Sequence, residues 1–285
     1  MQPSKSNDAF QNESRADPNL QTKTVLVTGA ARRLGREIAL GFARAGWDVA
    51  VHYGHSQQEA LETVEAIRTL GCQAIAVQAD LADETATRAM FERACHEFGQ
   101  INCLVNSASR FEFDRPERFS YQALEDHVAP NLAAPLLLTQ QMHAATAADA
   151  QGVVINLLDQ KLENLNPDFF SYTLTKAALL FATKMMATAF APRLRVVAVS
   201  PGITLVSGEQ SADGFANAHR MTPLGRSSRP EDIVQAVLYL ANATAVTGVN
   251  LPVDGGQHLM PLDRDVMHLV EPGISEQQPS SDKPS

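Results

Sequence analysis

Short apolar runs alternate with longer amphipathic stretches along most of this chain. Runs of four to six residues rich in valine, isoleucine and leucine predict buried strands, and the stretches between them predict helices. The expected strands are Thr24–Thr28, Val49–Tyr53, Ala74–Gln78, Ile101–Val105, Val153–Leu158, Val196–Val199 and Asn250–Val253. The expected helices are Leu34–Ala45, Gln57–Leu70, Asp83–Phe98, Tyr121–Ala148, Phe170–Phe190 and Pro230–Ala243.

Regular alternation of strand and helix predicts an α/β fold with a parallel sheet of about seven strands, covered by helices on both faces. Right-handed crossovers make this a doubly wound, Rossmann-type sheet. Residues 23–260 contain no repeat or linker, so we expect a single domain there. The polar segments 1–22 and 261–285 are expected to be disordered tails.

Composition narrows the possible functions. The chain has 285 residues and a net charge of −9, which argues against a nucleic-acid surface. No apolar run is long enough for a membrane span, and the first residues lack the apolar core of a secretory signal. Three cysteines and eight histidines show no metal-ligand or redox spacing. These features predict a cytoplasmic protein with a small-molecule partner and no bound metal.

Tyr172 and Lys176 lie four residues apart in an apolar stretch that favours a helix, so they share one helix face. An ammonium beside a phenol favours the phenolate, which predicts a lowered pKa for Tyr172 and a role in proton transfer. The spacing alone is common, and a surface helix pair is the alternative interpretation.

A glycine-containing turn, Thr28–Gly35, directly follows the first strand and opens the first helix. This is where a dinucleotide pyrophosphate binds, because backbone N–H groups and the helix N-terminus face the anion. The second strand then shows which cofactor to expect. No acid follows it to bind a ribose 2′-hydroxyl; His52, Tyr53, His55 and Ser56 stand there instead. With Arg32 and Arg33 nearby, these donors predict a 2′-phosphate and therefore NADPH.

Together these motifs resemble the short-chain dehydrogenase/reductase family over roughly Lys23 to Leu259. The match includes the turn, Asp80-Leu81, Asn106–Ser109, Asn131, Tyr172 with Lys176, Pro201-Gly202 and Val253–Gly256. The resemblance implies cofactor contacts at Gly29, Arg32, Arg33, Leu34, Gly35, His52, Tyr53, His55, Ser56, Asp80, Leu81, Asn106, Ala108, Ser109, Lys176, Pro201, Gly202 and Ile203. It also implies a dimer or tetramer.

Four departures from the usual family pattern are informative. Arg33 replaces the middle glycine of the turn, Ser109 replaces a glycine, and Phe111 follows closely. Asp159 replaces the catalytic serine thirteen residues before Tyr172. Together they are similar to the pteridine reductase and dihydromonapterin reductase subgroup. Gly54-His55 departs from that subgroup, where a stronger base is expected.

This narrower resemblance implies hydride transfer to the C=N bond of a dihydropterin. Phe111 is expected to hold the flat ring against the nicotinamide, and Arg33 to bridge the pyrophosphate and the ring. Asp159 is expected to bind the amino-pyrimidine edge or to form a proton relay with Tyr172. Ser109 is a further substrate contact.

Lys176 is expected to hold the nicotinamide ribose, and Asn131 to organise a water linked to it. A carboxylate beside Tyr172 opposes phenolate formation, so the proton donor stays open between Asp159 and Tyr172. A loop-capping role for Asp159 and simple loop packing for Phe111 are the structural alternatives.

Two other functions remain open from the sequence. In a carbonyl reductase acting on oxoacyl thioesters or sugar ketones, Asp159 would merely replace the serine. A nucleotide-sensing regulator of the same fold would need no proton donor, so Tyr172 and Lys176 argue against it.

Overall fold

The computed structural model describes residues 23–206 and 211–270. In this part of the chain seven strands form one sheet in the order β3-β2-β1-β4-β5-β6-β7, and every neighbouring pair is parallel. The strands are Thr24–Val27 (β1), Asp48–Tyr53 (β2), Ala74–Gln78 (β3), Cys103–Asn106 (β4), Gly152–Leu157 (β5), Leu194–Pro201 (β6) and Asn250–Val253 (β7). The predicted doubly wound fold is confirmed.

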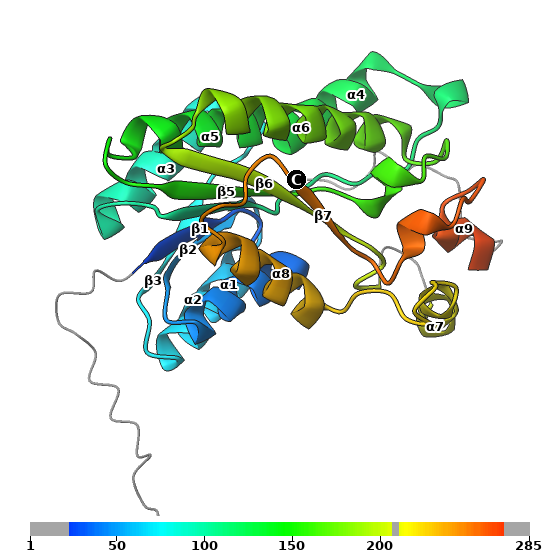
Figure 1. Cartoon of the computed structure of the whole chain (residues 1–285), viewed down its shortest axis with the longest axis horizontal. Helices are drawn as coiled ribbons and strands as arrows, with labels where there is room; N and C mark the ends of the chain where they lie inside the picture. Colours follow the sequence, from blue (N-terminus) through cyan, green and yellow to red (C-terminus); the bar gives the residue numbers. More distant parts are fainter. Residues whose placement is uncertain (1–22, 207–210, 271–285) are drawn as a thin grey trace, which may run out of the picture.

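Helices cover both faces of the sheet (Figure 1). They are Arg33–Arg44 (α1), Gln57–Thr69 (α2), Glu84–Phe98 (α3), Tyr121–Val128 (α4), Ala134–Ala145 (α5), Phe170–Ala189 (α6), Ala212–Arg220 (α7), Pro230–Asn242 (α8) and Val266–Val270 (α9). One buried apolar cluster joins α1, α2 and α8 to the sheet, and a second joins α3, α5 and α6 to the opposite face. The five inner strands, β1, β2, β4, β5 and β6, are buried on both faces, which explains their continuous apolar sequence.

The segment expected as one helix over Tyr121–Ala148 is broken in the structure. A π-helical turn over Ala129–Ala133 separates α4 from α5. Pro130 lies in this turn and has no N–H to donate, so the regular hydrogen-bond ladder cannot continue through it. The turn brings the buried Asn131 toward the loop that follows β4.

The expectation of a disordered segment from residue 261 onward is wrong for residues 261–270. These residues run back over the domain and end in the short helix α9 (Figure 1). Residues 1–22 and 271–285, also expected to be disordered, lie outside the described residues. The helix α7, within the long segment after β6, was not predicted either.

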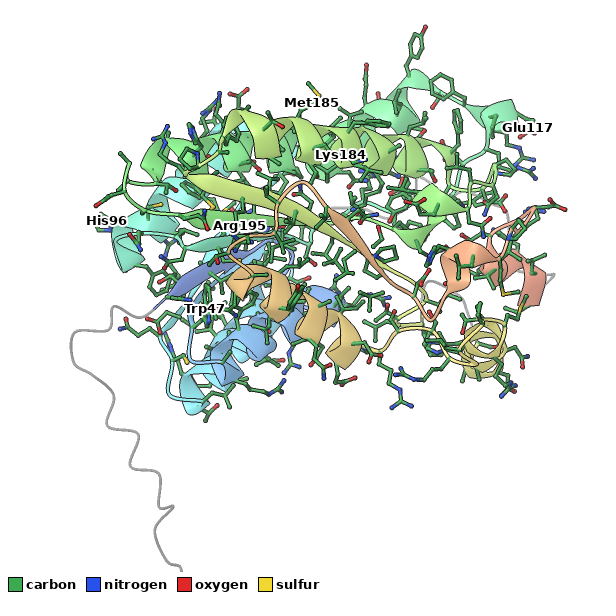
Figure 2. All side chains as sticks on the ribbon, viewed as in Figure 1. Trp47, His96, Glu117, Lys184, Met185 and Arg195 are labelled. Atoms are coloured by element: carbon green, nitrogen blue, oxygen red, sulfur yellow. The ribbon has the colours of Figure 1, made fainter. Side chains whose placement is uncertain are left out.

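Arg195 and the neighbouring pair Lys184 and Met185 show how side chains divide between core and surface (Figure 2). Arg195 is buried on β6, and its guanidinium donates to the carbonyls of Leu240, Ala241 and Val246, which holds the end of α8 on the sheet. Lys184 and Met185 lie on the exposed side of α6. No helix in the described ranges is long and apolar enough to cross a bilayer.

Candidate active site

A cleft of about 590 Å³ opens where the strand order reverses, at the carboxyl ends of β1, β4, β5 and β6. Its size suits a nucleotide with a small substrate, and its position is where open α/β sheets bind ligands. The expected site residues that line it are Gly29, Arg32, Arg33, Leu34, Gly35, Tyr53, His55, Ser56, Ala108, Ser109, Phe111, Asp159, Tyr172, Lys176, Pro201, Gly202 and Ile203. His52, Asp80, Leu81, Asn106 and Asn131 do not line it.

The turn after β1 is packed closely against the loop after β4. Gly29 has a positive φ of 66°, and a Cβ there would lie 2.9 Å from the Ala108 Cα. The Thr28 hydroxyl accepts hydrogen bonds from the N–H groups of Ser107 and Ala108, both at 3.0 Å. The turn therefore needs glycine for its backbone shape, and it leaves the N-terminus of α1 facing the cleft.

His52 supports the glycine turn from beneath. The Gly29 N–H donates to His52 Nδ1 at 3.0 Å, and Nε2 lies 3.1 Å from the Ala79 carbonyl, which assigns the proton to Nε2. Burial lowers the pKa of His52 to about 4, so the ring is neutral at pH 7. The expected contact of His52 with a 2′-phosphate is thus replaced by a structural role.

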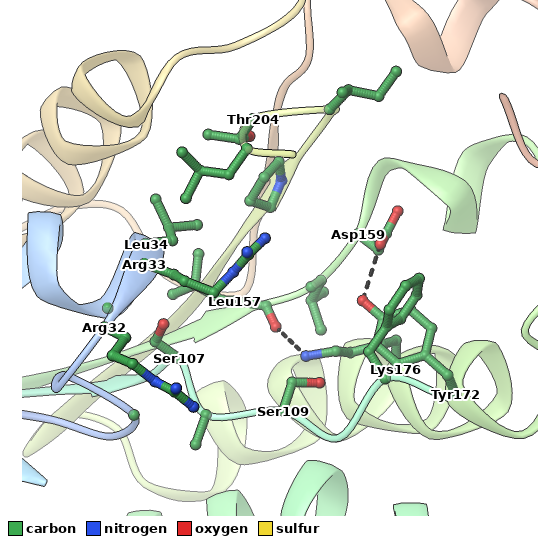
Figure 3. A pocket seen from close by; sticks show the side chains of 18 of the residues that line it. Arg32, Arg33, Leu34, Ser107, Ser109, Leu157, Asp159, Tyr172, Lys176 and Thr204 are labelled. Atoms are coloured by element: carbon green, nitrogen blue, oxygen red, sulfur yellow. Dashed lines mark hydrogen bonds between the residues drawn. The ribbon is translucent and has the colours of Figure 1, made fainter. Parts of the chain in front are cut away.

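Arg32 and Arg33 lie side by side at the start of α1, and both side chains extend along the cleft (Figure 3). Arg32 has a side chain that is 63% exposed, and its guanidinium lies 3.7 Å from the carboxylate of Glu59. Arg33 donates to the Val206 carbonyl at 2.8 Å, across the mouth of the cleft. Arg33 has a positive φ of 54°, which fits the glycine usual at this position and is strained for arginine.

Three of the predicted cofactor contacts, Asp80, Leu81 and Asn106, lie outside this cleft. Asp80 is exposed and accepts a hydrogen bond from the Ala82 N–H at 2.9 Å, which closes the turn after β3. Leu81 is buried in the apolar cluster under α3. Asn106 is also buried, and its amide donates to Asn156 Oδ1 between β4 and β5.

Tyr172 and Asp159 meet directly in the cleft (Figure 3). The phenol donates to Asp159 Oδ2 at 2.9 Å, and Asp159 Oδ1 accepts the Lys161 N–H at 2.8 Å. Asp159 therefore caps the short helix Gln160–Glu163 and binds the phenol at the same time. From the sequence, a loop cap and a proton relay with Tyr172 were alternative roles for Asp159. Its contacts in the structure fit both roles at once.

The pKa values of this pair are set mainly by burial. Burial raises the pKa of Asp159, although the Lys161 N–H and the Tyr172 hydroxyl oppose the rise. Burial and then the Asp159 carboxylate raise the pKa of Tyr172 well above its usual value near 10. The expectation that Lys176 lowers the pKa of Tyr172 is therefore wrong in this structure, because burial and Asp159 outweigh it.

Lys176 lies on the same face of α6 as Tyr172, as the four-residue spacing predicted. Its ammonium donates to the Leu157 carbonyl at 2.7 Å, at the end of β5 (Figure 3). Burial lowers the pKa of Lys176 to about 8, against the opposing effect of Asp159. The lysine is thus charged at neutral pH and close to losing its proton.

Asn131 holds the loop after β4 rather than lining the cleft. Its carbonyl oxygen accepts the Arg110 N–H at 2.7 Å and the Ser109 hydroxyl at 3.3 Å. Its amide donates to the Arg110 carbonyl and to the Thr175 hydroxyl on α6. Asn131 therefore ties the Ser109 loop to the helix that carries Tyr172 and Lys176.

Phe111 forms part of an aromatic wall. Its ring stacks on Phe169 at 4.1 Å between centroids, and Tyr172 meets it edge-on at 4.7 Å. Phe111 is still 43% exposed, which is high for a ring in such a contact. Phe169 precedes α6, and nothing in the sequence singled it out.

A buried carboxylate fixes the start of α6. Asp114 accepts hydrogen bonds from both the N–H and the hydroxyl of Ser171, the residue next to Tyr172. A negative charge at a helix N-terminus is favourable, so Asp114 stabilises the first turn of α6 and with it the position of the phenol.

The far wall of the cleft comes from the segment after β7, of which residues 261 onward were expected to be disordered. Gln257, Asp265, Val266 and Met267 line it, together with Thr204 and Leu205 after β6. Their sequence is polar and irregular, so periodicity gave no signal for them. Among the described residues, no group of three or more histidine, cysteine or acidic side chains is arranged to hold a metal ion.

Comparison with known proteins agrees with this geometry. The sequence profile of the family described as Enoyl-(Acyl carrier protein) reductase matches residues 29–258. A 3-oxoacyl-[acyl-carrier-protein] reductase of Staphylococcus aureus is 32% identical over 243 residues, covering 84% of this chain and 99% of the relative.

Two solved structures are also similar. FolM alternative dihydrofolate reductase 1 from Brucella canis, complexed with NADP, has a TM-score of 0.81 and 38% identity, over 86% of this chain and 97% of that one. The Brucella suis protein of the same description, also in complex with NADP, has a TM-score of 0.78 and 36% identity, over 86% and 98%.

Proposed function

Because the chain belongs to the short-chain dehydrogenase/reductase family, we propose that it is an NADPH-dependent reductase of the C=N bond of a dihydropterin. The observation that carries the proposal is the hydrogen bond between Tyr172 and Asp159, where the usual family pattern has a serine. Candidate substrates are dihydromonapterin, dihydrobiopterin and dihydrofolate. The Brucella structures, described as dihydrofolate reductases with NADP, support the same chemistry.

The residues of the cleft fit the cofactor. A Cβ at Gly35 would collide with the Gly29 carbonyl, so glycine lets the start of α1 pack directly on the turn that would hold the pyrophosphate. Arg32 is the exposed cation expected to bind the 2′-phosphate, with Tyr53, His55 and Ser56 beside it in the cleft. Lys176 is placed to hold the ribose hydroxyls of the nicotinamide half.

The protein's own part in the reaction is to orient the ring and supply a proton. When bound, NADPH supplies the hydride. Tyr172 and Asp159 share a proton at the phenol oxygen, and this pair would deliver it to the ring nitrogen of the C=N bond. The Phe111 ring provides an apolar platform for the flat substrate.

A carbonyl reductase is the second candidate, favoured by the similarity to the Staphylococcus oxoacyl reductase. In that reaction the serine thirteen residues before the tyrosine, where this chain has Asp159, stabilises a carbonyl oxygen. A carboxylate opposes negative charge on that oxygen, so Asp159 is poorly suited to the role of the serine. A dihydropterin is therefore the better candidate substrate.

The test is oxidation of NADPH with a panel of dihydromonapterin, dihydrobiopterin, dihydrofolate and an acetoacetyl thioester, with NADH run in parallel. We expect turnover of a pterin with NADPH. The Asp159→Ser variant should lose pterin reduction and keep or gain thioester reduction. Turnover of the thioester alone by the native chain would overturn the proposal and support the carbonyl reductase.

We also propose that the protein assembles into a dimer or tetramer through the face of α6. Phe181 and Met185 are 65% and 71% exposed on this helix, and both are large apolar side chains. Sedimentation would test this, with Phe181→Glu as the disrupting variant.

A further inference from the structure

The segment after β7 is fixed against the cleft by the loop between β5 and α6. The Asn164 amide donates to the Met260 carbonyl, and its oxygen accepts the Leu262 N–H at 3.0 Å. The Asp168 carboxylate accepts from Arg264 Nε and from the Asp265 N–H, both at 2.8 Å. Asp168 is fully buried, so these bonds are shielded from water. The segment 260–265 is therefore held in place, and its last residue, Asp265, forms part of the wall of the cleft.

This wall presents a second carboxylate to the cleft. Asp265 Oδ2 lies 3.3 Å from the buried ammonium of Lys161, and Oδ1 accepts the Met267 N–H at 3.1 Å. The Asp265 side chain is 20% exposed and lines the cleft beside Met267. Each carboxylate oxygen accepts up to two hydrogen bonds, so Asp265 retains acceptor capacity toward a ligand.

Asp265 lines the same cleft as the Tyr172–Asp159 pair. Lys161 links the two carboxylates, because its N–H donates to Asp159 and its ammonium lies 3.3 Å from Asp265. Burial is the main cause of the raised pKa of both groups, and the charge of Asp265 adds to the rise of each. Lys161 faces Asp159 as well and acts in the opposite direction. Whatever accepts a proton from the pair therefore has its neighbouring atoms near Asp265.

The chemistry of the substrate identifies those atoms. In a 7,8-dihydropterin the C=N bond joins N5 to C6, and the side chain is attached to C6. Hydride adds to C6 and the proton adds to N5, so the C=N double bond becomes a single bond. The opposite charges of the hydride and the proton cancel in the product. The first atom of the C6 side chain therefore lies two bonds from N5, the atom that takes the proton.

We propose that Asp265 accepts a hydrogen bond from a hydroxyl of the C6 side chain and so selects hydroxylated dihydropterins. This inference rests on the proposed function and adds a specificity residue to it. Asp265 is expected to contribute to the binding of a polyol side chain, while a bare methyl group in the same place gains nothing from it.

The test compares kcat/KM for dihydromonapterin and for 6-methyl-7,8-dihydropterin, which share the ring and the reacting bond. The Asp265→Ser variant keeps a side-chain oxygen that caps α9 but withdraws the acceptor from the cleft. We expect it to lower the ratio of the two values roughly tenfold or more, the loss typical of a hydrogen bond to a charged group. Asp263→Ser, at an exposed position outside the cleft, should leave the ratio unchanged.

The ratio separates recognition of the C6 side chain from general damage to the site. A displaced segment or the loss of the ion pair with Lys161 would change kcat/KM for both substrates equally. An equal fall for both substrates would overturn the inference and leave the proposed function standing. If the native enzyme reduces neither pterin, the proposed function fails and this inference fails with it. Should Asp265→Ser not fold, Asp265→Thr also keeps a capping oxygen and withdraws the carboxylate from the cleft, and an unchanged ratio in that variant is equally decisive against Asp265.

Discussion

The phenol oxygen of Tyr172 lies 2.9 Å from Asp159 Oδ2, while the other oxygen of Asp159 accepts a backbone N–H from Lys161. The backbone therefore fixes the carboxylate, and the carboxylate fixes the phenol. Burial raises the pKa of both groups, so the pair retains protons to higher pH than either group would in water. A pair of this kind titrates as a unit, and it suits protonation of a ring nitrogen.

Replacing Asp159 by asparagine should separate activity from stability. We expect kcat for the pterin to fall by roughly a hundredfold or more, because the relay loses its proton. The pKa of Asp159 is raised in the folded state, so ionisation of this carboxyl at higher pH destabilises the fold, whereas a neutral side chain does not. Asp159→Asn should thus be at least as resistant to urea as the native protein at pH 8. Near-native kcat in this variant would exclude Asp159 from proton transfer.

The pH dependence should show an alkaline limit set by Lys176. Burial lowers its pKa to about 8, so the ammonium is fully charged below this pH and neutral above it. We expect kcat/KM to decline as pH rises through about 8. Arginine stays charged over this range, so Lys176→Arg should move the decline upward even if its maximal rate is lower. A decline at the same pH in Lys176→Arg would assign the limit to another group.

The strands along the chain and the place of the cofactor turn were predictable because apolar runs and turn residues are local signals. Tyr172 and Lys176 were found the same way, since their four-residue spacing places them on one face of α6. Asp159 was found only through the resemblance to the family, which has a serine at this position. The break in the helix from Tyr121 was signalled only by Pro130, which the apolar pattern around it concealed.

His52 and Asp265 were beyond sequence reasoning for a different reason. A histidine at a strand end looks like a ligand, and only the packing of Gly29 and Ala79 around His52 shows that it is buried and neutral. Asp265 depends on contacts with Lys161 and Asp168, about a hundred residues earlier in the chain. Polar composition gave no indication of such distant partners.

Selectivity for NADPH should depend on Arg32, since His52 carries no charge. Arg32→Ala should weaken NADPH binding several-fold to about tenfold. This is the lower end of the range for a charge-assisted hydrogen bond, because solvent screens the exposed side chain. NADH lacks the 2′-phosphate, so its affinity should hardly change. Fluorescence titration of both cofactors measures this, with Arg36→Ala, outside the cleft, as the matched control. Equal losses for both cofactors would assign Arg32 to the shared pyrophosphate instead.

Replacing Arg33 by glycine should stabilise the fold and impair the site. Arg33 has a φ of 54°, a left-handed conformation that costs a non-glycine residue roughly 1–2 kcal/mol. Arg33→Gly relieves this strain, so the urea midpoint should rise or stay level despite the added freedom of the unfolded chain. Arg32 has a φ of −141°, with no strain to relieve, so Arg32→Gly should lower the midpoint. Arg33→Gly also removes the cation that faces the substrate, and the KM for the pterin should rise. A lower midpoint together with an unchanged KM would contradict both parts, because Arg33 would then serve the fold and not the ligand.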